Sequence, residues 1–433
     1  MKIAIIGTGV AGNVAAYHLN KHHDIAVFET NDYIGGHTHT HNVEGAGGPH
    51  SVDSGFIVFN YATYPQFTRL LAELDVEAQL SEMSFGVRCD TTGLEYMGSS
   101  LNTLFAQRRN LLRPSFWGMI GDILRFNRNA GELLADDGND ITLGDYLAEQ
   151  GYGEAFIHHY LIPMAAAVWS ADHQLMEQFP ARYLLHFFHN HGLLKVADRP
   201  DWYVIKGGSK VYAEALTRAH REHIRLSTPV LAVRREASRV IVTSDAGEET
   251  FDALFVACHS DQALALLEDP SETERAVLGA ISYQDNEVLL HTDSSLMPRR
   301  RRAWAAWNYH LQDTGAGARP VAVTYNMNIL QGFDCDQQYC VTLNNSTAID
   351  PNQVIARMHY QHPVYTPESV AAQGRQAEIN GPMRTYYCGA YWRYGFHEDG
   401  VVSGRQVATL INRLPNLPVA RHDQLLSGDV ASA

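Results

Sequence analysis

The sequence has few cysteines and no paired arrangement of them. Its five cysteines are an odd number, and no two are separated by only two residues. This usage is typical of a reducing compartment and argues against a disulfide framework. No apolar run approaches the roughly 20 residues of a membrane-spanning helix. Residues 1–6 lead straight into a glycine turn, so we expect no signal peptide and a cytoplasmic protein, with any membrane contact peripheral.

Positive charge is scarce as well. The 33 lysines and arginines are outnumbered by 48 aspartates and glutamates, which gives a formal net charge of -15. We therefore expect no nucleic-acid partner. Apolar residues, in contrast, are plentiful. They make up 45% of the 433 residues, enough for a large core and for two or three domains.

The N-terminus has the pattern of a nucleotide-binding strand, turn and helix. Residues 2–6 form a short apolar run typical of a buried parallel strand, and residues 13–19 have a helical pattern. Between them lies G-x-G-x-x-G. Gly7 permits the tight turn, Gly9 lets a pyrophosphate approach the helix N-terminus, and Gly12 lets the helix pack on the strand. The motif alone is weak, but this context is the one it requires.

An acidic residue follows at the expected place. A second predicted strand, residues 25–28, ends at Glu29, which is 22 residues after Gly7. A carboxylate there accepts hydrogen bonds from ribose hydroxyls and repels a 2′-phosphate. The sequence therefore predicts a dinucleotide with an unmodified ribose.

The residues after Glu29 favour FAD over NAD. The spacing from Glu29 to Gly35 and Gly36 resembles the flavin amine oxidase superfamily, and within it a bacterial subgroup of predicted NAD/FAD-binding oxidoreductases. The superfamily includes monoamine and polyamine oxidases, protoporphyrinogen oxidase, phytoene-type desaturases and polyenoic fatty acid isomerases. The resemblance implies that the glycine pair lies near the FAD phosphates. An arginine usually follows the pair, where this chain has His37.

The C-terminal part resembles the closing motif of the same superfamily. A predicted strand over residues 386–390 is followed by a helical run from Gly400. The resemblance implies that the N-terminus of this helix faces the isoalloxazine ring, with Val401 and Val402 beside it. A helix N-terminus also stabilises negative charge on reduced flavin, whatever the family.

The middle of the chain resembles the return of the superfamily fold to its cofactor domain. Residues 202–208 precede a helix from about Lys210, and a strand over residues 224–233 contains Val230, which the resemblance places near adenine. The stretches 53–60 and 391–400 look typical of the bacterial subgroup. No histidine or cysteine stands in a familiar flavin-attachment context, so we expect noncovalent FAD. The predicted cofactor-binding residues are Gly7, Gly9, Ala11, Gly12, Glu29, Gly35, Gly36, His37, Gly55, Phe56, Val230, Gly389, Phe396, Val401 and Val402.

These motifs predict an α/β fold, a Rossmann-type FAD-binding domain interleaved with a mixed sheet-plus-helix substrate domain as in amine oxidases. Residues 1–80, 200–280 and 366–425 are predicted to form the FAD-binding domain. Residues 81–199 and 281–365, which match no cofactor motif, are predicted to form the substrate domain. The sequence does not predict the oligomeric state.

Three histidines early in the chain are an alternative candidate for metal binding. His37, His39 and His41 alternate as they would along one face of a strand. With no second cluster of ligands, three such histidines more often line a polar face or a cofactor pocket. We expect no metal.

The resemblance also locates the catalytic region, where this chain departs from amine oxidases. Many of these enzymes hold a water near the flavin with a lysine, but residues 283–290 contain none, and Phe396 stands where a cage tyrosine often lies. His397, Glu398 and Tyr394 are the candidate proton acceptors. Roles in cofactor packing or loop ordering are open for each of them.

The leading functional prediction is an FAD-dependent oxidoreductase that removes a hydride from a carbon of an apolar or lipid-like substrate, as a desaturase or dehydrogenase does. The alternatives are an amine oxidase that produces hydrogen peroxide, a flavin-dependent double-bond isomerase, and a non-enzymatic lipid-binding protein. Two basic segments, residues 108–128 and 297–304, lie beside aromatic and aliphatic residues. They suggest either contact with an anionic lipid surface or a solvated flank.

Overall fold

The computed structural model describes residues 1–45, 48–135, 141–170, 173–195, 199–312 and 322–412. A five-stranded parallel sheet contains the first strand of the chain. Its strands, in spatial order, are β10 (Ile224–Arg225), β2 (Asp24–Phe28), β1 (Lys2–Ile6), β14 (Ala253–Val256) and β20 (Thr385–Tyr387). β1 lies at the centre and pairs in parallel with β2 and β14. Segments far apart in the sequence therefore build one sheet.

Both faces of the parallel sheet are covered. One face packs against α1 (Val10–Leu19) and α16 (His397–Asn412), and the other against an antiparallel sheet of β11 (Val230–Arg235), β12 (Val240–Ser244) and β13 (Gly247–Phe251). Ile3 and Ile5 pack on the helix side, while Ala4 and Ile6 pack on the other side. This burial on both faces explains why β1 is apolar at every position from Ile3 onward.

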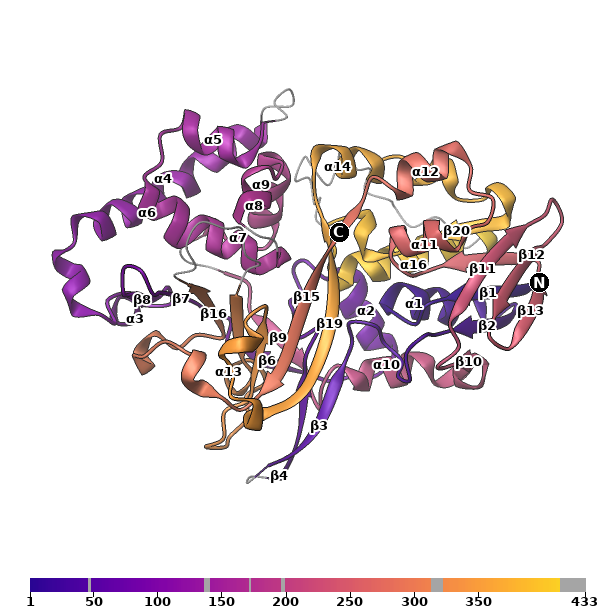
Figure 1. Ribbon diagram of the computed structural model, residues 1–433, viewed down its shortest axis with the longest axis horizontal. Helices are drawn as coiled ribbons and strands as arrows, with labels where there is room; N and C mark the ends of the chain where they lie inside the picture. The colour runs from indigo at the N-terminus through magenta and orange to yellow at the C-terminus, as the bar shows by residue number, and fades with distance from the viewer. Residues whose placement is uncertain (46–47, 136–140, 171–172, 196–198, 313–321, 413–433) are drawn as a thin grey trace.

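A second, mixed sheet has seven strands. In spatial order they are β19 (Val354–Val364), β15 (Ser282–His291), β18 (Cys340–Leu343), β17 (Ala322–Asn326), β16 (Trp307–Leu311), β7 (Phe85–Cys89) and β8 (Leu94–Met97). The long pair β15 and β19 runs down the middle of the molecule, between the helical region on the left of Figure 1 and the parallel sheet on the right.

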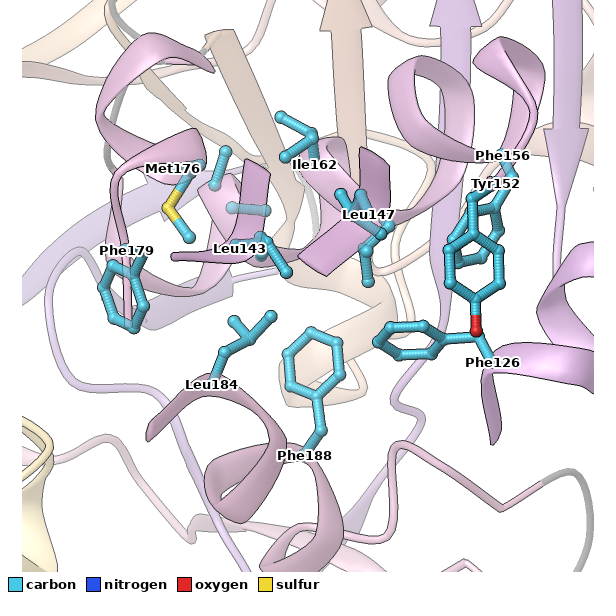
Figure 2. Close-up of a cluster of buried hydrophobic side chains, with 14 of the residues drawn as sticks. Phe126, Leu143, Leu147, Tyr152, Phe156, Ile162, Met176, Phe179, Leu184 and Phe188 are labelled. Atoms are coloured by element: carbon cyan, nitrogen blue, oxygen red, sulfur yellow. The ribbon is translucent and has the colours of Figure 1, made fainter. Parts of the chain in front are cut away.

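Six helices pack together beside this sheet. They are α4 (Pro114–Ala135), α5 (Leu143–Glu149), α6 (Glu154–Phe156), α7 (Ile162–Trp169), α8 (His173–Glu177) and α9 (Ala181–Asn190). Their buried side chains form one hydrophobic cluster, in which Phe126, Phe156 and Phe188 are fully covered (Figure 2). This cluster also includes Tyr309 and Val323 of the seven-stranded sheet, so helices and sheet share a core.

The remaining elements connect these layers. β3 (Thr40–Gly45) pairs with β4 (Gly48–Asp53), and β9 (Trp202–Ile205) lies between β5 (Val58–Phe59) and β6 (Ala78–Ser81). The other helices are α2 (Pro65–Glu73), α3 (Leu101–Leu104), α10 (Lys210–Thr217), α11 (Ser260–Leu266), α12 (Glu272–Leu278), α13 (Met327–Gln331), α14 (Pro367–Gln373) and α15 (Gln376–Ile379).

The predicted fold class is confirmed, but several predicted elements are wrong in detail. α16 begins at His397, not near Gly400, because the Asp399 carboxylate in its first turn accepts the Phe396 N–H at 3.0 Å. The strand predicted over residues 224–233 is two strands in different sheets, separated at Ser227, whose φ of 47° is left-handed. The strand predicted over residues 386–390 ends at Tyr387.

The three early histidines do not share one strand. His37 lies in a turn and His39 precedes β3, so only His41 is within the strand. The predicted domain boundaries stay a prediction. Residues 413–425, predicted to end the FAD-binding domain, lie outside the described residues.

A buried ion pair holds β11, α12 and β20 together. Arg235 donates to both carboxylate oxygens of Glu274, at 2.5 and 2.9 Å, and the Tyr387 hydroxyl donates to the same carboxylate at 2.6 Å. Burial raises the pKa of Glu274, but the hydrogen bonds from Arg235 and Tyr387 outweigh it and lower the pKa to about 2. The pair therefore stabilises the fold at neutral pH, and its contribution is lost as the pH falls from 4.5 towards 2.

Arg235→Met should lower the free energy of unfolding by about 3–5 kcal/mol, because it leaves the Glu274 carboxylate buried without its counter-ion. Arg234→Met is the matched control. Arg234 is the preceding residue, and its ion pair with Glu248 at 3.6 Å is about half exposed, so we expect a loss below about 1 kcal/mol. Urea unfolding at pH 7 measures both, and equal losses would contradict the role given to Glu274.

Candidate active site

The first glycine turn connects β1 to α1. Gly7 has a φ of 99°, which only glycine adopts easily, and its N–H donates to the Phe28 carbonyl at 2.8 Å. A Cβ at Gly12 would lie 2.1 Å from the Gly7 carbonyl oxygen. At Gly9, the N-cap of α1, a Cβ would meet no described atom within 4 Å. Gly12 thus lies in tight contact with the turn, while Gly9 leaves space beside the helix N-terminus, as a phosphate-binding turn requires.

The second glycine turn touches the first. A Cβ at Gly36 would lie 3.2 Å from the Gly9 Cα, and one at Gly35 would clash with Thr38. The Gly35 N–H donates to the Thr8 hydroxyl at 3.3 Å, and the same hydroxyl donates to Glu29. The structure therefore brings the predicted residues Gly9, Gly35 and Gly36 together.

Glu29 is buried at the end of β2 and already has protein partners. One carboxylate oxygen accepts from the Thr8 N–H and hydroxyl, at 2.9 and 2.5 Å, and the other accepts from the Asn31 N–H at 2.9 Å and from its side-chain amide at 3.0 Å. These bonds fix the glycine turn. Contact with a ribose stays a prediction. Thr8 is a partner that sequence reasoning missed, although it lies inside the motif.

His37, Gly55 and Phe56 meet beside these turns. The Phe56 N–H donates to the His37 carbonyl at 2.8 Å, and a Cβ at Gly55 would lie 2.1 Å from the same oxygen. The His37 ring packs against Tyr360 and His362 of β19, with ring centroids 4.9 and 5.5 Å away. Burial, followed by the neighbouring His362 and His259, lowers the pKa of His37 well below its usual value.

The Nε2 atom of His37 is buried without a hydrogen-bond partner among the described residues. Such an atom is costly unless a ligand satisfies it. His362 and His259, which lie on two other segments, were missed because no sequence spacing connects them to His37. Among the described residues, no group of three or more histidine, cysteine or acidic side chains is arranged to hold a metal ion.

His397 begins α16 and is enclosed by polar and aromatic neighbours. Its ring stacks on Phe56 at 3.5 Å, and its Nε2 lies 2.7 Å from the Tyr212 hydroxyl and 3.0 Å from the Thr38 hydroxyl. Burial lowers the pKa of His397 to about 3, so the ring is neutral. The structure thus gives His397 a place in a buried network that includes two residues, Thr38 and Tyr212, that the sequence did not predict.

Glu398 also has a structural partner. Its carboxylate accepts the N–H groups of Gln66 and Phe67, at 2.8–3.1 Å, and so caps the start of α2. Burial raises the pKa of Glu398 to about 7, although the two backbone hydrogen bonds oppose this. Catalytic roles for His397 and Glu398 stay predictions.

Tyr394 and Phe396 lie against aromatic side chains of α7 and α9. The Phe396 ring stacks on Phe187 at 4.8 Å, and Tyr394 lies 4.5 Å from Tyr183. Trp169 donates its indole N–H to the Tyr394 carbonyl at 3.2 Å. Burial raises the pKa of Tyr394. We call these five side chains, Trp169, Tyr183, Phe187, Tyr394 and Phe396, the aromatic wall.

The other predicted cofactor-binding residues lie on α1 and α16, or within or next to strands of the two sheets beside them. α16 crosses α1 so closely that a Cβ at Gly404 would lie 2.3 Å from the Ala11 carbonyl oxygen. Val401 is buried and Val402 half-buried on α16, and the Gly389 N–H donates to the Ser403 hydroxyl at 3.0 Å. Val230 begins β11, two residues after Thr228, whose N–H donates to the Glu29 carbonyl at 2.8 Å.

Asp53 is a buried carboxylate that the sequence analysis did not single out. It accepts from the Thr40 hydroxyl at 2.5 Å and from the Ser209 N–H and hydroxyl at 2.7–3.0 Å. Burial raises the pKa of Asp53 to about 6, against these hydrogen bonds. The Gln331 side chain adds a further bond at 3.1 Å. Asp53 at the end of β4 therefore connects this strand to Ser209, the N-cap of α10, and to Gln331 of α13.

The glycine turn between β1 and α1, on a parallel sheet, has the geometry of a dinucleotide-binding fold. A family model described as flavin containing amine oxidoreductase matches residues 10–301. The chain belongs to this family and is a flavin-dependent oxidoreductase. No curated protein matches it in sequence.

Solved structures share the fold at low identity. A cyclohexylamine oxidase from Brevibacterium oxydans IH-35A is 16% identical with a TM-score of 0.68, over 95% of this chain and 98% of that chain. A CLA-producing fatty acid isomerase from P. acnes is 16% identical with a TM-score of 0.67, over 96% and 98%. A putrescine oxidase is 15% identical with a TM-score of 0.67, over 96% and 100%.

Gly9→Ala and Gly12→Ala should change different properties, flavin affinity in the first and stability in the second. The added methyl group at Gly9 meets only open space, so the flavin-free protein should keep its Tm within about 2 °C while flavin affinity falls at least about tenfold, or 1.4 kcal/mol. At Gly12 the methyl group clashes with Gly7, which should lower the stability of the flavin-free protein by about 1–3 kcal/mol. Fluorescence titration and thermal unfolding measure the two effects. Unchanged flavin affinity in Gly9→Ala would contradict the site.

Proposed function

We propose that the chain binds FAD noncovalently at the two glycine turns and the start of α16, and that it oxidises a carbon atom of an apolar, lipid-like substrate. Bound flavin supplies the hydride acceptor. Gly9 and Gly36 would face the pyrophosphate, and Glu29 the ribose. Val230 follows the segment hydrogen-bonded to Glu29, which supports its place near adenine. The unpartnered Nε2 of His37 offers a further polar contact.

The positive end of α16 supports a place for the flavin ring. The first turn of this helix leaves backbone N–H groups without helical partners, and these stabilise negative charge nearby. α16 begins at His397. We therefore propose that the first turn of this helix contacts the flavin ring, in addition to Val401 and Val402.

The aromatic wall is the observation that supports an apolar substrate. It covers the loop before α16 with rings from Trp169 and Phe187, which favour a hydrocarbon chain by burial. The acids beside it are not available to an ammonium ion. Glu398 caps α2, and Asp399 accepts the Phe396 N–H and pairs with Arg393 at 3.4 Å. A cationic amine would therefore lack a counter-ion here.

The three candidate catalytic residues take different parts in this proposal. His397 is neutral and bonded to two hydroxyl groups, and Glu398 is bonded to α2, so both position the start of α16. The Tyr394 phenol stays protonated at neutral pH because burial raises its pKa. We therefore give Tyr394 the role of orienting the substrate within the aromatic wall.

Anaerobic mixing with two substrate panels tests this proposal. Fatty acyl lipids and polyenes should bleach the oxidised flavin, and amines should not. Phe187→Ala should raise the lipid concentration for half-maximal bleaching about tenfold or more, because the substrate loses a large apolar contact. Phe251→Ala, which removes a ring buried beside β2, is the control for general destabilisation.

Bleaching by a primary or secondary amine and by no lipid would contradict the apolar substrate and favour an amine oxidase. A double-bond isomerase returns its hydride, so it would leave the flavin oxidised and yield a product of unchanged mass. Mass spectrometry and chromatography of the lipid after mixing separate that outcome from desaturation, which lowers the mass by two hydrogens.

A further inference from the structure

The end of the molecule that carries α3 and β8 (Figure 1) has exposed apolar and basic side chains. Four large apolar residues are exposed there, with Leu112 at 89%, Leu101 at 76%, Trp117 at 50% and Leu111 at 46%. Exposed side chains of this size are unfavourable in water when they lie together. We call them, with the arginines described next, the leucine–arginine surface. Its arginines are Arg88, Arg108, Arg109, Arg113, Arg299, Arg300, Arg301 and Arg302.

Contacts between separate segments hold this surface together. Arg109 donates to the Gly93 carbonyl at 2.6 Å, which joins the 3-10 helix Arg108–Leu112 to the turn before β8. The N–H groups of Arg299 and Arg300 donate to the buried Glu95 carboxylate at 2.9 and 3.2 Å. The structure thus brings Arg109 of one basic segment and Arg299 and Arg300 of the other to the start of β8.

The apolar residues are fixed in the same way. The Trp117 indole N–H donates to the Leu111 carbonyl at 2.9 Å, and the Trp117 ring packs against Phe105 at 5.4 Å. Leu111 and Leu112 end a 3-10 helix that leads into α4, and Leu101 begins α3. Their exposure is therefore a property of ordered elements.

Between these segments lies a hollow of about 510 Å³ lined by Arg88, Arg109, Arg299 and Arg300, with Gln107 at its wall. Two carboxylates, Asp90 and Glu95, also line it, so four positive charges face two negative ones. Asp90 is bonded to Arg88 and His310, at 3.2 and 2.7 Å, and Glu95 to the backbone. The side chains of Arg299 and Arg300 are exposed.

We propose that the leucine–arginine surface docks on a membrane that contains anionic lipid, with a headgroup phosphate in the hollow and Leu101, Leu111, Leu112 and Trp117 in the outer acyl region. Guanidinium groups bind phosphate with matched geometry, and tryptophan favours the membrane interface. Charge complementarity selects this partner, because the chain as a whole carries a formal charge of -15 while this surface is basic. The docking concerns the outer surface and does not depend on the substrate proposed above.

Sedimentation with lipid vesicles tests the proposal on the flavin-loaded protein. Vesicles of phosphatidylcholine with one third phosphatidylglycerol should bind it, and phosphatidylcholine alone should bind it at least about tenfold less. The double variant Arg299→Glu and Arg300→Glu should lower binding at least about tenfold, since each basic residue near an anionic lipid surface strengthens binding. Leu111→Ser with Leu112→Ser should lower it by a similar factor.

Matched variants outside the leucine–arginine surface control for the effect of changing charge or apolar area anywhere on the protein. The first control is Arg218→Glu with Arg221→Glu, on the 3-10 helix Arg218–His223. The second is Leu231→Ser, which removes a leucine that is 59% exposed on β11. Both should bind vesicles within twofold of the natural chain. Flavin absorbance and Tm verify that each variant is folded. Quenching of tryptophan fluorescence by brominated lipid should fall in Trp117→Phe.

Several results would overturn the proposal. One is the absence of binding to anionic vesicles at 0.1 M salt, which is also the result expected if the surface serves an acidic protein instead. Another is an equal loss of binding in the control variants. A third is saturable binding of inorganic phosphate that Arg299→Glu abolishes while vesicles stay unbound, because the hollow would then take a free anion.

Discussion

Gly400 and Gly404 of α16 lie directly on α1, at distances that no larger residue permits. A Cβ at Gly400 would come within 2.4 Å of the Val10 side chain, and one at Gly404 within 2.3 Å of the Ala11 carbonyl oxygen. This contact brings the starts of both helices to the same edge of the parallel sheet. In the site that we propose, the backbone N–H groups at the two helix starts would serve one bound molecule, the first at its phosphates and the second at its ring. The same contact positions the loop before α16, in which Tyr394 and Phe396 pack against aromatic side chains of α7 and α9.

The polar groups around this helix contact are mostly bonded to one another, and this shapes what the site can do. His397 is hydrogen-bonded to Tyr212 and Thr38, and Glu398 caps α2. Such groups stabilise the helix start but are poor partners for a charged substrate. The side chains that pack against the loop before α16 are, in contrast, largely those of the aromatic wall. In the function that we propose, the reaction depends on holding a substrate C–H bond in place, which the aromatic wall would achieve by its shape.

Local patterns in the sequence predicted the first strand, turn and helix of the parallel sheet. β1, the first glycine turn and Glu29 all lie within the first 29 residues, so their spacing along the chain was enough to predict how they are arranged. The start of α16 was predicted three residues late, because Asp399 caps the helix from its own first turn. The histidine arrangement was wrong for a different reason. His37 meets His362 and His259, which come from distant segments, and no local period encodes such contacts. The seven-stranded sheet is built from pairs of strands far apart in the sequence, such as β15 and β19, and no sequence motif marks it.

The central claim is that the two helix starts hold FAD, without a covalent bond, in one site. Acid precipitation of the purified protein followed by mass spectrometry of the supernatant tests it most directly. We expect the yellow colour to leave the precipitate completely, the released compound to have the mass of FAD, and the amount to be one molecule per chain. Release of FMN, of a nicotinamide nucleotide or of no chromophore, or flavin that stays with the precipitated protein, would contradict the claim.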